Sequence, residues 1–107
     1  MAQKPLFELI YDPEIDQHLA MIDRKYYFLI RRTIKEQLSY APEVETRNRK
    51  PLQQPSVFGT AWELRFGSDN RFRVFYRTDA INHQVRILAI GIKSGNRLFI
   101  GGEEFKL

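Results

Sequence analysis

Arginines alternate with apolar residues in two neighbouring segments of the chain. Every second residue is apolar in each segment, namely Trp62, Leu64 and Phe66 in the first and Phe72, Val74 and Tyr76 in the second. Because successive side chains of a strand point to opposite faces, the charged residues between them are expected together on the other face of a sheet. These charged residues are Glu63, Arg65, Arg71 and Arg73. Guanidinium groups bind phosphates through paired hydrogen bonds, so the pattern favours recognition of a polyanion.

The turn between the two segments determines which arginines face each other. Keeping both apolar sets on one face pairs Phe66 with Phe72, and therefore places Arg65 opposite Arg73. Two like charges in this position destabilise a sheet by an amount within about 0.2 to 1 kcal/mol. Glu63 on the same face is one source of neutralising charge, and a bound phosphate is the other. We expect the pair to be open to a ligand on an uncovered face, where an arginine contributes little to stability.

A third segment adds small residues and one more cation. Residues 85–92 form a nearly continuous apolar run, which predicts a strand. Ala89 and Gly91 have the same parity as Lys93 in this strand, so they are expected to form a shallow floor with Lys93 at its rim. A floor of small residues ringed by cations would fit a nucleotide backbone.

Basic residues are concentrated in the second half of the chain. The whole chain has 17 lysines and arginines against 13 acidic residues, for a net charge of +4. Ten of the basic residues but only three acidic ones lie between Arg47 and Arg97, which indicates one basic face. A polar loop in this half carries Arg47, Arg49 and Lys50, which together with Arg71 are the candidate nucleic-acid-binding residues.

The first half has the periodicity of a strand and two helices. Residues 5–11 predict a short strand, and the Asp-Pro-Glu sequence after it predicts a helix start with Asp12 as the cap. Residues 15–22 and 23–40 repeat apolar positions at helical spacing. The outer side of the second helix holds Arg31, Arg32 and Lys35, and a solvated helix face is the simpler interpretation of these cations.

The order of these elements indicates an α+β architecture. We predict an N-terminal strand, two helices, and then a three- to four-stranded antiparallel sheet with the helices on one face. Its last piece would be the short apolar stretch at residues 98–100. The length fits a single domain over residues 1–107.

The composition excludes several kinds of site. The 107 residues include no cysteine, which removes disulfides, thiol catalysis and cysteine-ligated metals. His18 and His83 lack metal-ligand spacing, and each is expected at the surface. A domain of this size has little room for a large cofactor, so we expect no cofactor and no metal. No apolar run approaches the roughly 18 residues of a membrane span, so we expect a cytoplasmic protein without membrane contact.

The sequence resembles the RelE/ParE toxin superfamily of bacterial toxin–antitoxin systems. The resemblance covers nearly the whole chain and is carried most strongly by residues 61–100, which contain WELRF, a glycine turn, RFRVFY and VRILAIGIK. Members closest to RelE cut messenger RNA on the ribosome, whereas ParE-like members poison DNA gyrase. The resemblance therefore implies three partners: a cognate antitoxin protein, messenger RNA and the ribosome.

The resemblance also implies roles for individual residues. Arg65, Arg73 and Lys93 match basic residues that bind or stabilise the scissile phosphate in RelE-type ribonucleases. Phe99 stands where those enzymes place a tyrosine. Arg49 and Lys50 are the nearest basic residues to a pair of lysines that such enzymes carry before the second strand of the sheet, although here they lie further upstream.

The leading hypothesis is a metal-independent endoribonuclease toxin that cleaves messenger RNA and so inhibits translation. In such an enzyme a base removes the proton of the ribose 2′-hydroxyl, and cations stabilise the phosphorane that forms. Arg65, Arg73 and Lys93 are the candidate catalytic residues, and Glu63 or Lys50 is the candidate base. Two alternatives remain open at this stage: a ParE-like toxin that inhibits gyrase without nucleolysis, and a non-toxic nucleic-acid-binding module.

Overall fold

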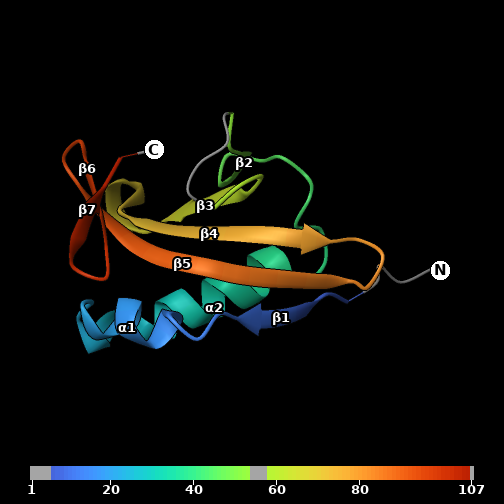
Figure 1. Ribbon diagram of the computed structural model, residues 1–107, viewed down its shortest axis with the longest axis horizontal. Helices are drawn as coiled ribbons and strands as arrows, with labels where there is room; N and C mark the ends of the chain where they lie inside the picture. The colour runs from blue at the N-terminus through green and yellow to red at the C-terminus, as the bar shows by residue number, and fades with distance from the viewer. Residues whose placement is uncertain (1–5, 54–57, 107) are drawn as a thin grey trace.

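A single curved sheet with two helices against one side makes up the molecule (Figure 1). The computed structural model describes residues 6–53 and 58–106. The helices within these residues are α1 (Ile15–Ala20) and α2 (Tyr27–Leu38), and two 3-10 turns occupy Arg24–Tyr26 and Ser68–Asn70. The strands are β1 (Glu8–Tyr11), β2 (Arg49–Pro51), β3 (Trp62–Phe66), β4 (Phe72–Asp79), β5 (Gln84–Ser94), β6 (Arg97–Ile100) and β7 (Glu103–Phe105). No described helix has the length and hydrophobicity needed to cross a membrane.

The prediction of an α+β fold with helices on one face is confirmed, but the sheet is larger than expected. The described residues form seven strands, whereas the prediction was the N-terminal strand and three or four more. Six of the seven follow the order β2-β3-β4-β5-β6-β7 with antiparallel neighbours. β2 and β7 have three residues each, too few to show an alternating pattern in the sequence. β1 pairs in parallel with β5, a long-range pairing that no local pattern specifies.

β1 and β6 both pair with the same edge of β5. β1 pairs with its first residues, Gln84–Ile87, and β6 pairs with its last residues, Gly91–Ser94. Between them the backbone N–H of Ile90 donates to Nδ1 of His18, at 3.3 Å. His18 is thus half-buried against the sheet, which corrects the expectation of a surface histidine.

The side of the sheet that faces the helices holds the larger core. Ile30, Ile34 and Leu38 of α2 are completely buried there, as their helical spacing predicts. The second helix is shorter than predicted, because its first turn is the 3-10 turn, where Asp23 accepts a hydrogen bond from the N–H of Lys25.

The predicted cap of the first helix is wrong. The residue that precedes α1 is Glu14, which makes no capping bond with its side chain. The carboxylate of Asp12 instead accepts a hydrogen bond from Arg86, at 2.9 Å.

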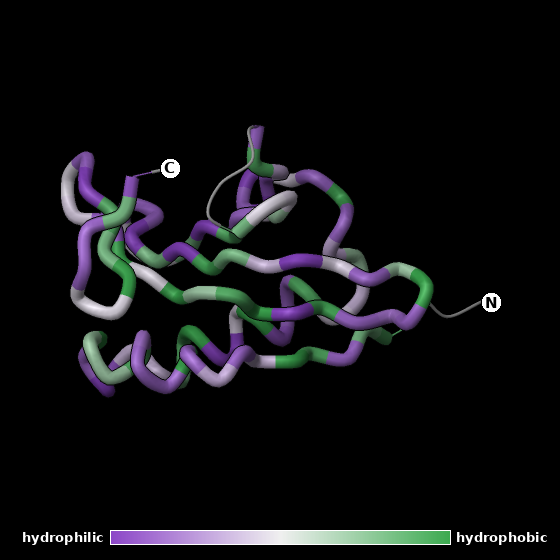
Figure 2. Tube along the Cα trace, in the orientation of Figure 1, coloured by the Kyte–Doolittle hydropathy of each residue, from purple (hydrophilic) through white to green (hydrophobic). Residues whose placement is uncertain are grey.

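A bulge in β5 changes which of its residues face the helices. The pairing of β4 with β5 shifts between Phe75 and Tyr76, and this leaves Leu88 without a partner residue. Val85 and Ile87 face the helices before the bulge, and Ile90 does so after it. Figure 2 shows hydrophobic and hydrophilic positions mixed along the two central strands.

The other side of the sheet is covered, whereas the sequence predicts an uncovered face. Phe75 and Ala89 are fully buried there against Leu98 and Ile100 of β6. A Cβ atom at Gly91 would lie 2.7 Å from the carbonyl oxygen of Phe99, so this glycine permits the close approach of β6. The predicted floor of small residues is therefore covered by the β6–β7 hairpin.

Candidate functional site

The predicted register of the two arginine-bearing strands is confirmed. Phe66 of β3 pairs with Phe72 of β4, and Arg65 pairs with Arg73. The turn between them reverses at Gly67, whose φ of 83° suits glycine. Parity and turn length therefore bring the two guanidinium groups together.

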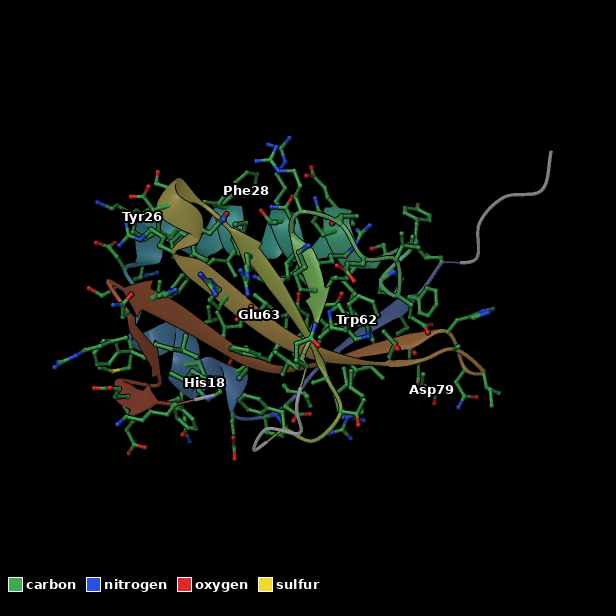
Figure 3. The ribbon with its side chains drawn as sticks, turned by 90° about the horizontal axis from the view of Figure 1, so that it is seen from above. His18, Tyr26, Phe28, Trp62, Glu63 and Asp79 are labelled. Carbon is green, nitrogen blue, oxygen red and sulfur yellow. The ribbon has the colours of Figure 1, made fainter. Side chains whose placement is uncertain are left out.

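Glu63 neutralises the arginine pair from within the protein. Its Oε1 accepts from Nε of Arg65 at 2.6 Å, and its Oε2 accepts from Nη1 of Arg73 at 3.2 Å. Nε of Arg73 also donates to the carbonyl oxygen of Asn70, at 2.8 Å. The expectation of an unneutralised pair is thus wrong; we call Glu63, Arg65 and Arg73 the arginine cluster (Figure 3 labels Glu63).

The members of the arginine cluster differ in exposure. The side chains of Glu63 and Arg73 are 3% and 9% exposed, whereas that of Arg65 is 39% exposed. A buried carboxylate needs cationic partners to offset its desolvation, and here it has two. Since both oxygens of Glu63 accept hydrogen bonds from arginines, the geometry suits Glu63 to orienting the guanidinium groups more than to removing a proton.

Lys93 lies at the junction of two surface hollows. One, of about 380 Å³, is lined by the arginine cluster residues Glu63 and Arg73 together with Lys93. The other, of about 520 Å³, is lined by Asp69, Arg71 and Lys93 among others. Within the described residues, the Lys93 ammonium group has no hydrogen-bond or ion-pair partner. It is therefore the cation at this site that a bound anion could engage without displacing an internal partner.

The C-terminal hairpin supplies a wall of the smaller hollow that the sequence did not reveal. Glu104, Phe105 and Lys106 line it, opposite the arginine cluster. The turn that returns β7 to this position contains Gly101 and Gly102, with φ of 62° and 84°. Two consecutive glycines are a turn signal that could have predicted the hairpin, although not its place over the sheet.

Arg71 is anchored to the helical layer. Its guanidinium carbon lies 5.1 Å from the centre of the Tyr26 ring, and its Nη1 donates to the Tyr26 hydroxyl at 3.3 Å. The backbone carbonyl of Arg71 accepts from the N–H of Lys93, at 2.7 Å. The two cations of the larger hollow are thus held on adjacent segments.

The basic run before β3 is divided between two faces. The predicted loop forms β2, in which Arg49 pairs with Leu64 and Lys50 pairs with Glu63. Residues directly opposite in a sheet share a face, so Lys50 lies beside the arginine cluster and Arg49 points toward the helices.

Arg49 is a structural residue in this arrangement. Its Nη1 donates to the carbonyl of Gln37 at 2.7 Å, and its Nε donates to the carbonyl of Val44 at 2.9 Å. These bonds satisfy carbonyl groups at and beyond the last turn of α2. The guanidinium group, which the sequence predicts to bind nucleic acid, is therefore already occupied by internal partners. Lys50 pairs with Glu45 at 3.3 Å, and Arg47 is exposed.

Phe99 lies away from the arginine cluster. It pairs with Ile92 of β5, whose side chain contributes to the helix-side core, whereas Lys93 pairs with Leu98. Phe99 and Lys93 therefore point to opposite faces. The position where the resemblance implies a tyrosine does not face the hollow that contains Arg73.

The comparisons with known proteins bear on the fold. No protein-family model matches the sequence, and no curated protein matches it. Among solved structures, the chain superposes on a chain in the crystal structure of the toxin–antitoxin complex RelBE2 from Mycobacterium tuberculosis, with a TM-score of 0.69. The chain therefore shares the fold of a chain in that complex. The two chains are 18% identical, and the match covers 87% of this chain and 98% of the other, so the resemblance is confirmed as a likeness of the whole fold.

Proposed function

We propose that this RelE-type chain is the toxin of a toxin–antitoxin system and acts as a metal-independent endoribonuclease on messenger RNA. The observation that carries the proposal is the arginine cluster beside Lys93, where a buried carboxylate holds two guanidinium groups in fixed orientations. Groups that are oriented before the reaction stabilise developing charge most effectively, because no reorganisation is needed in the transition state.

In the proposed reaction the 2′-hydroxyl of one ribose attacks the adjacent phosphorus, and the 5′-oxygen of the next nucleotide leaves. Arg65 and Arg73 stabilise the phosphorane, and Lys93 clamps the phosphate or protonates the leaving oxygen. Glu63 positions the arginines. Lys50, which lies opposite Glu63 on β2, is then the remaining candidate base.

The proposed partners follow from the same surface. An antitoxin would block the enzyme by covering the hollows around Lys93, and messenger RNA, on the ribosome or free, would be the substrate in the cytoplasm. The similar chain comes from a toxin–antitoxin complex, which supports the antitoxin as a partner.

The test is induced expression combined with primer-extension mapping of cellular transcripts. We expect growth arrest, with new transcript ends that appear before any DNA damage. Arg65→Ala and Lys93→Ala should abolish both effects, because these side chains are the more exposed cations of the site. Growth arrest by the wild-type chain without new transcript ends would overturn the proposal of ribonuclease activity.

A ParE-like toxin that inhibits gyrase by contact is the second candidate. The observation that favours it is Phe99, which has no hydroxyl and faces away from the arginine cluster. In that case, DNA damage should precede any change in transcripts. Expression without growth arrest would leave the third candidate, a nucleic-acid-binding module without toxicity.

A further inference from the structure

A second basic surface lies on the outer side of α2, away from the sheet. Its residues share one side of the helix and of the 3-10 turn before it, and all are exposed. We call them the α2 stripe: Arg24, Lys25, Phe28, Arg31, Arg32 and Lys35. Phe28 is 75% exposed and has a cation three or four residues away in both directions. Figure 3 labels Phe28 on α2 and Glu63 on the strands.

The cations of the α2 stripe form few ion pairs with the rest of the protein, although Asp12 and Asp16 line a surface hollow together with Arg31, and Asp23 caps the 3-10 turn beside Lys25. Arg32 pairs with Glu36 at 2.8 Å, and no other ion pair involves the stripe within the described residues. Arg31 and Lys35 stand four residues apart, where like charges destabilise a helix. Arg24 and Lys25 lie at the N-terminal end of α2, where the helix dipole favours acidic residues, and the first turn of α2 contains none.

The positions of these residues are therefore unfavourable for the isolated protein. An ordinary solvated face would intersperse more acidic residues among the cations. A polyanionic partner supplies the missing charge, and an unpaired base supplies a flat surface for the aromatic ring. Positive charge with an interleaved aromatic residue is the arrangement that binds single-stranded nucleic acid.

A protein partner fits this surface less well. The core of a protein interface is enriched in arginine and aromatic residues but depleted of lysine, and such interfaces bury about 800 Å² on each partner. Phe28 is the one apolar side chain in a stripe whose other five members are cations. The chemistry therefore matches a phosphate backbone more closely than an apolar protein surface.

The α2 stripe is connected to the candidate site by the Tyr26 ring. The ammonium group of Lys25 lies 5.2 Å from the ring centre, and the guanidinium carbon of Arg71 lies 5.1 Å from it. Arg71 in turn lines the larger hollow with Lys93. A strand of RNA that leaves this hollow past Arg71 thus meets further cations on the helical layer.

We propose that the α2 stripe is an RNA-anchoring surface, which holds a single-stranded part of the substrate outside the cleavage site by phosphate contacts and by base stacking on Phe28. The continuity with Lys93 rests on the proposed ribonuclease function, whereas binding by the stripe does not. The two can be separated, because RNA that is 2′-O-methylated has no nucleophile for the cleavage reaction and still has phosphates and bases.

The experiment measures binding of the full chain to a fluorescent 2′-O-methyl oligonucleotide at several salt concentrations. The double variant Arg31→Gln/Lys35→Gln should bind roughly tenfold more weakly at low salt, with the slope of log K against log salt reduced by about 1.4 for two lost single-strand phosphate contacts. The control variant Arg77→Gln/Arg86→Gln removes the same charge from the β4–β5 hairpin and should keep the wild-type slope.

Phe28→Ala tests the stacking contact. It should weaken binding of the single-stranded oligonucleotide about fivefold or more, and leave binding of a duplex of the same length unchanged. Wild-type affinity and slope in the Arg31→Gln/Lys35→Gln variant, or an equal loss in the hairpin control, would overturn the proposal. So would a stripe variant that binds the oligonucleotide normally but loses binding to poly-glutamate, because that result assigns the surface to an acidic protein. If the chain cleaves no RNA but its RNA binding still depends on the α2 stripe, the proposed ribonuclease activity is rejected and the proposed anchoring surface is retained.

Discussion

The arginine cluster and the α2 stripe are both rich in cations, but they differ in burial and in counter-charge. In the cluster, Arg73 is buried and the protein provides a carboxylate for it. In the stripe, the cations are exposed and water screens them, so the fold can leave most of them unpaired. The comparison shows that a buried cation needs an anionic partner within the protein, whereas an exposed cation can remain unpaired until it binds an external anion.

The largest effect should come from removing the carboxylate of the cluster. Glu63→Ala leaves two arginines opposite each other, one of them buried, and should lower the free energy of unfolding by about 3 to 5 kcal/mol. Urea denaturation measures it. Glu45→Ala is the matched control, because it removes an exposed carboxylate that pairs with Lys50 and should change stability by less than about 0.5 kcal/mol. Equal stabilities of the two variants would contradict the role that we give to Glu63.

The two arginines of the cluster should differ from each other. Arg73→Ala should cost about 2 kcal/mol or more, since it removes hydrogen bonds to Glu63 and to Asn70 in a buried position. Arg65→Ala should cost less than about 1 kcal/mol, because its side chain is 39% exposed. Parallel urea titrations compare them, and a reversed order would show that exposure does not govern this pair. Arg65 is consequently the cleaner position for testing activity.

A smaller effect is expected from His18, which accepts a hydrogen bond on Nδ1 and therefore must stay neutral. Burial lowers the pKa of His18 below its ordinary value of 6.5, against the opposing effect of Glu14. The unfolded chain thus takes up a proton at a higher pH than the folded chain, and stability should decrease as the pH falls below about 6.5. Urea titrations at pH 7.5 and 5.5 measure the decrease, which should be smaller in His18→Gln. An unchanged decrease in that variant would assign it to other groups.

The smallest effect should occur in the α2 stripe. Arg31→Gln/Lys35→Gln removes a repulsive pair on one helix face, and its free energy of unfolding should stay within about 0.5 kcal/mol of wild type, on the stabilising side. Thermal denaturation at low salt is the measurement. A loss above about 1 kcal/mol would mean that these cations have a structural role inside the fold.

The sequence predicts the β3–β4 hairpin well and the surroundings of the hairpin poorly. Parity and turn length are local properties, and they are sufficient to place Arg65 opposite Arg73. They do not decide whether Glu63 or a ligand neutralises the pair, because both alternatives satisfy the same parity. That choice depends on which segments cover the second face of the sheet.

The segments that cover the side of the sheet opposite the helices are placed by long-range pairing. The bulge at Leu88 and the return of the β6–β7 hairpin determine which β5 residues are enclosed, and neither follows from the pattern of residues 85–92. Arg49 illustrates the same limit. Its charge in a basic run suggested a ligand contact, but its pairing with Leu64 directs it to the end of α2.

The shared edge of β5 has a consequence for how the molecule opens. Because β1 and β6 lie end to end along this one strand, with β4 along its other edge, the amide hydrogens of β5 can all exchange only after several separate segments have detached. Its amides should be among the slowest of the whole chain in deuterium exchange, and fraying that starts at either terminus would stop at the same strand.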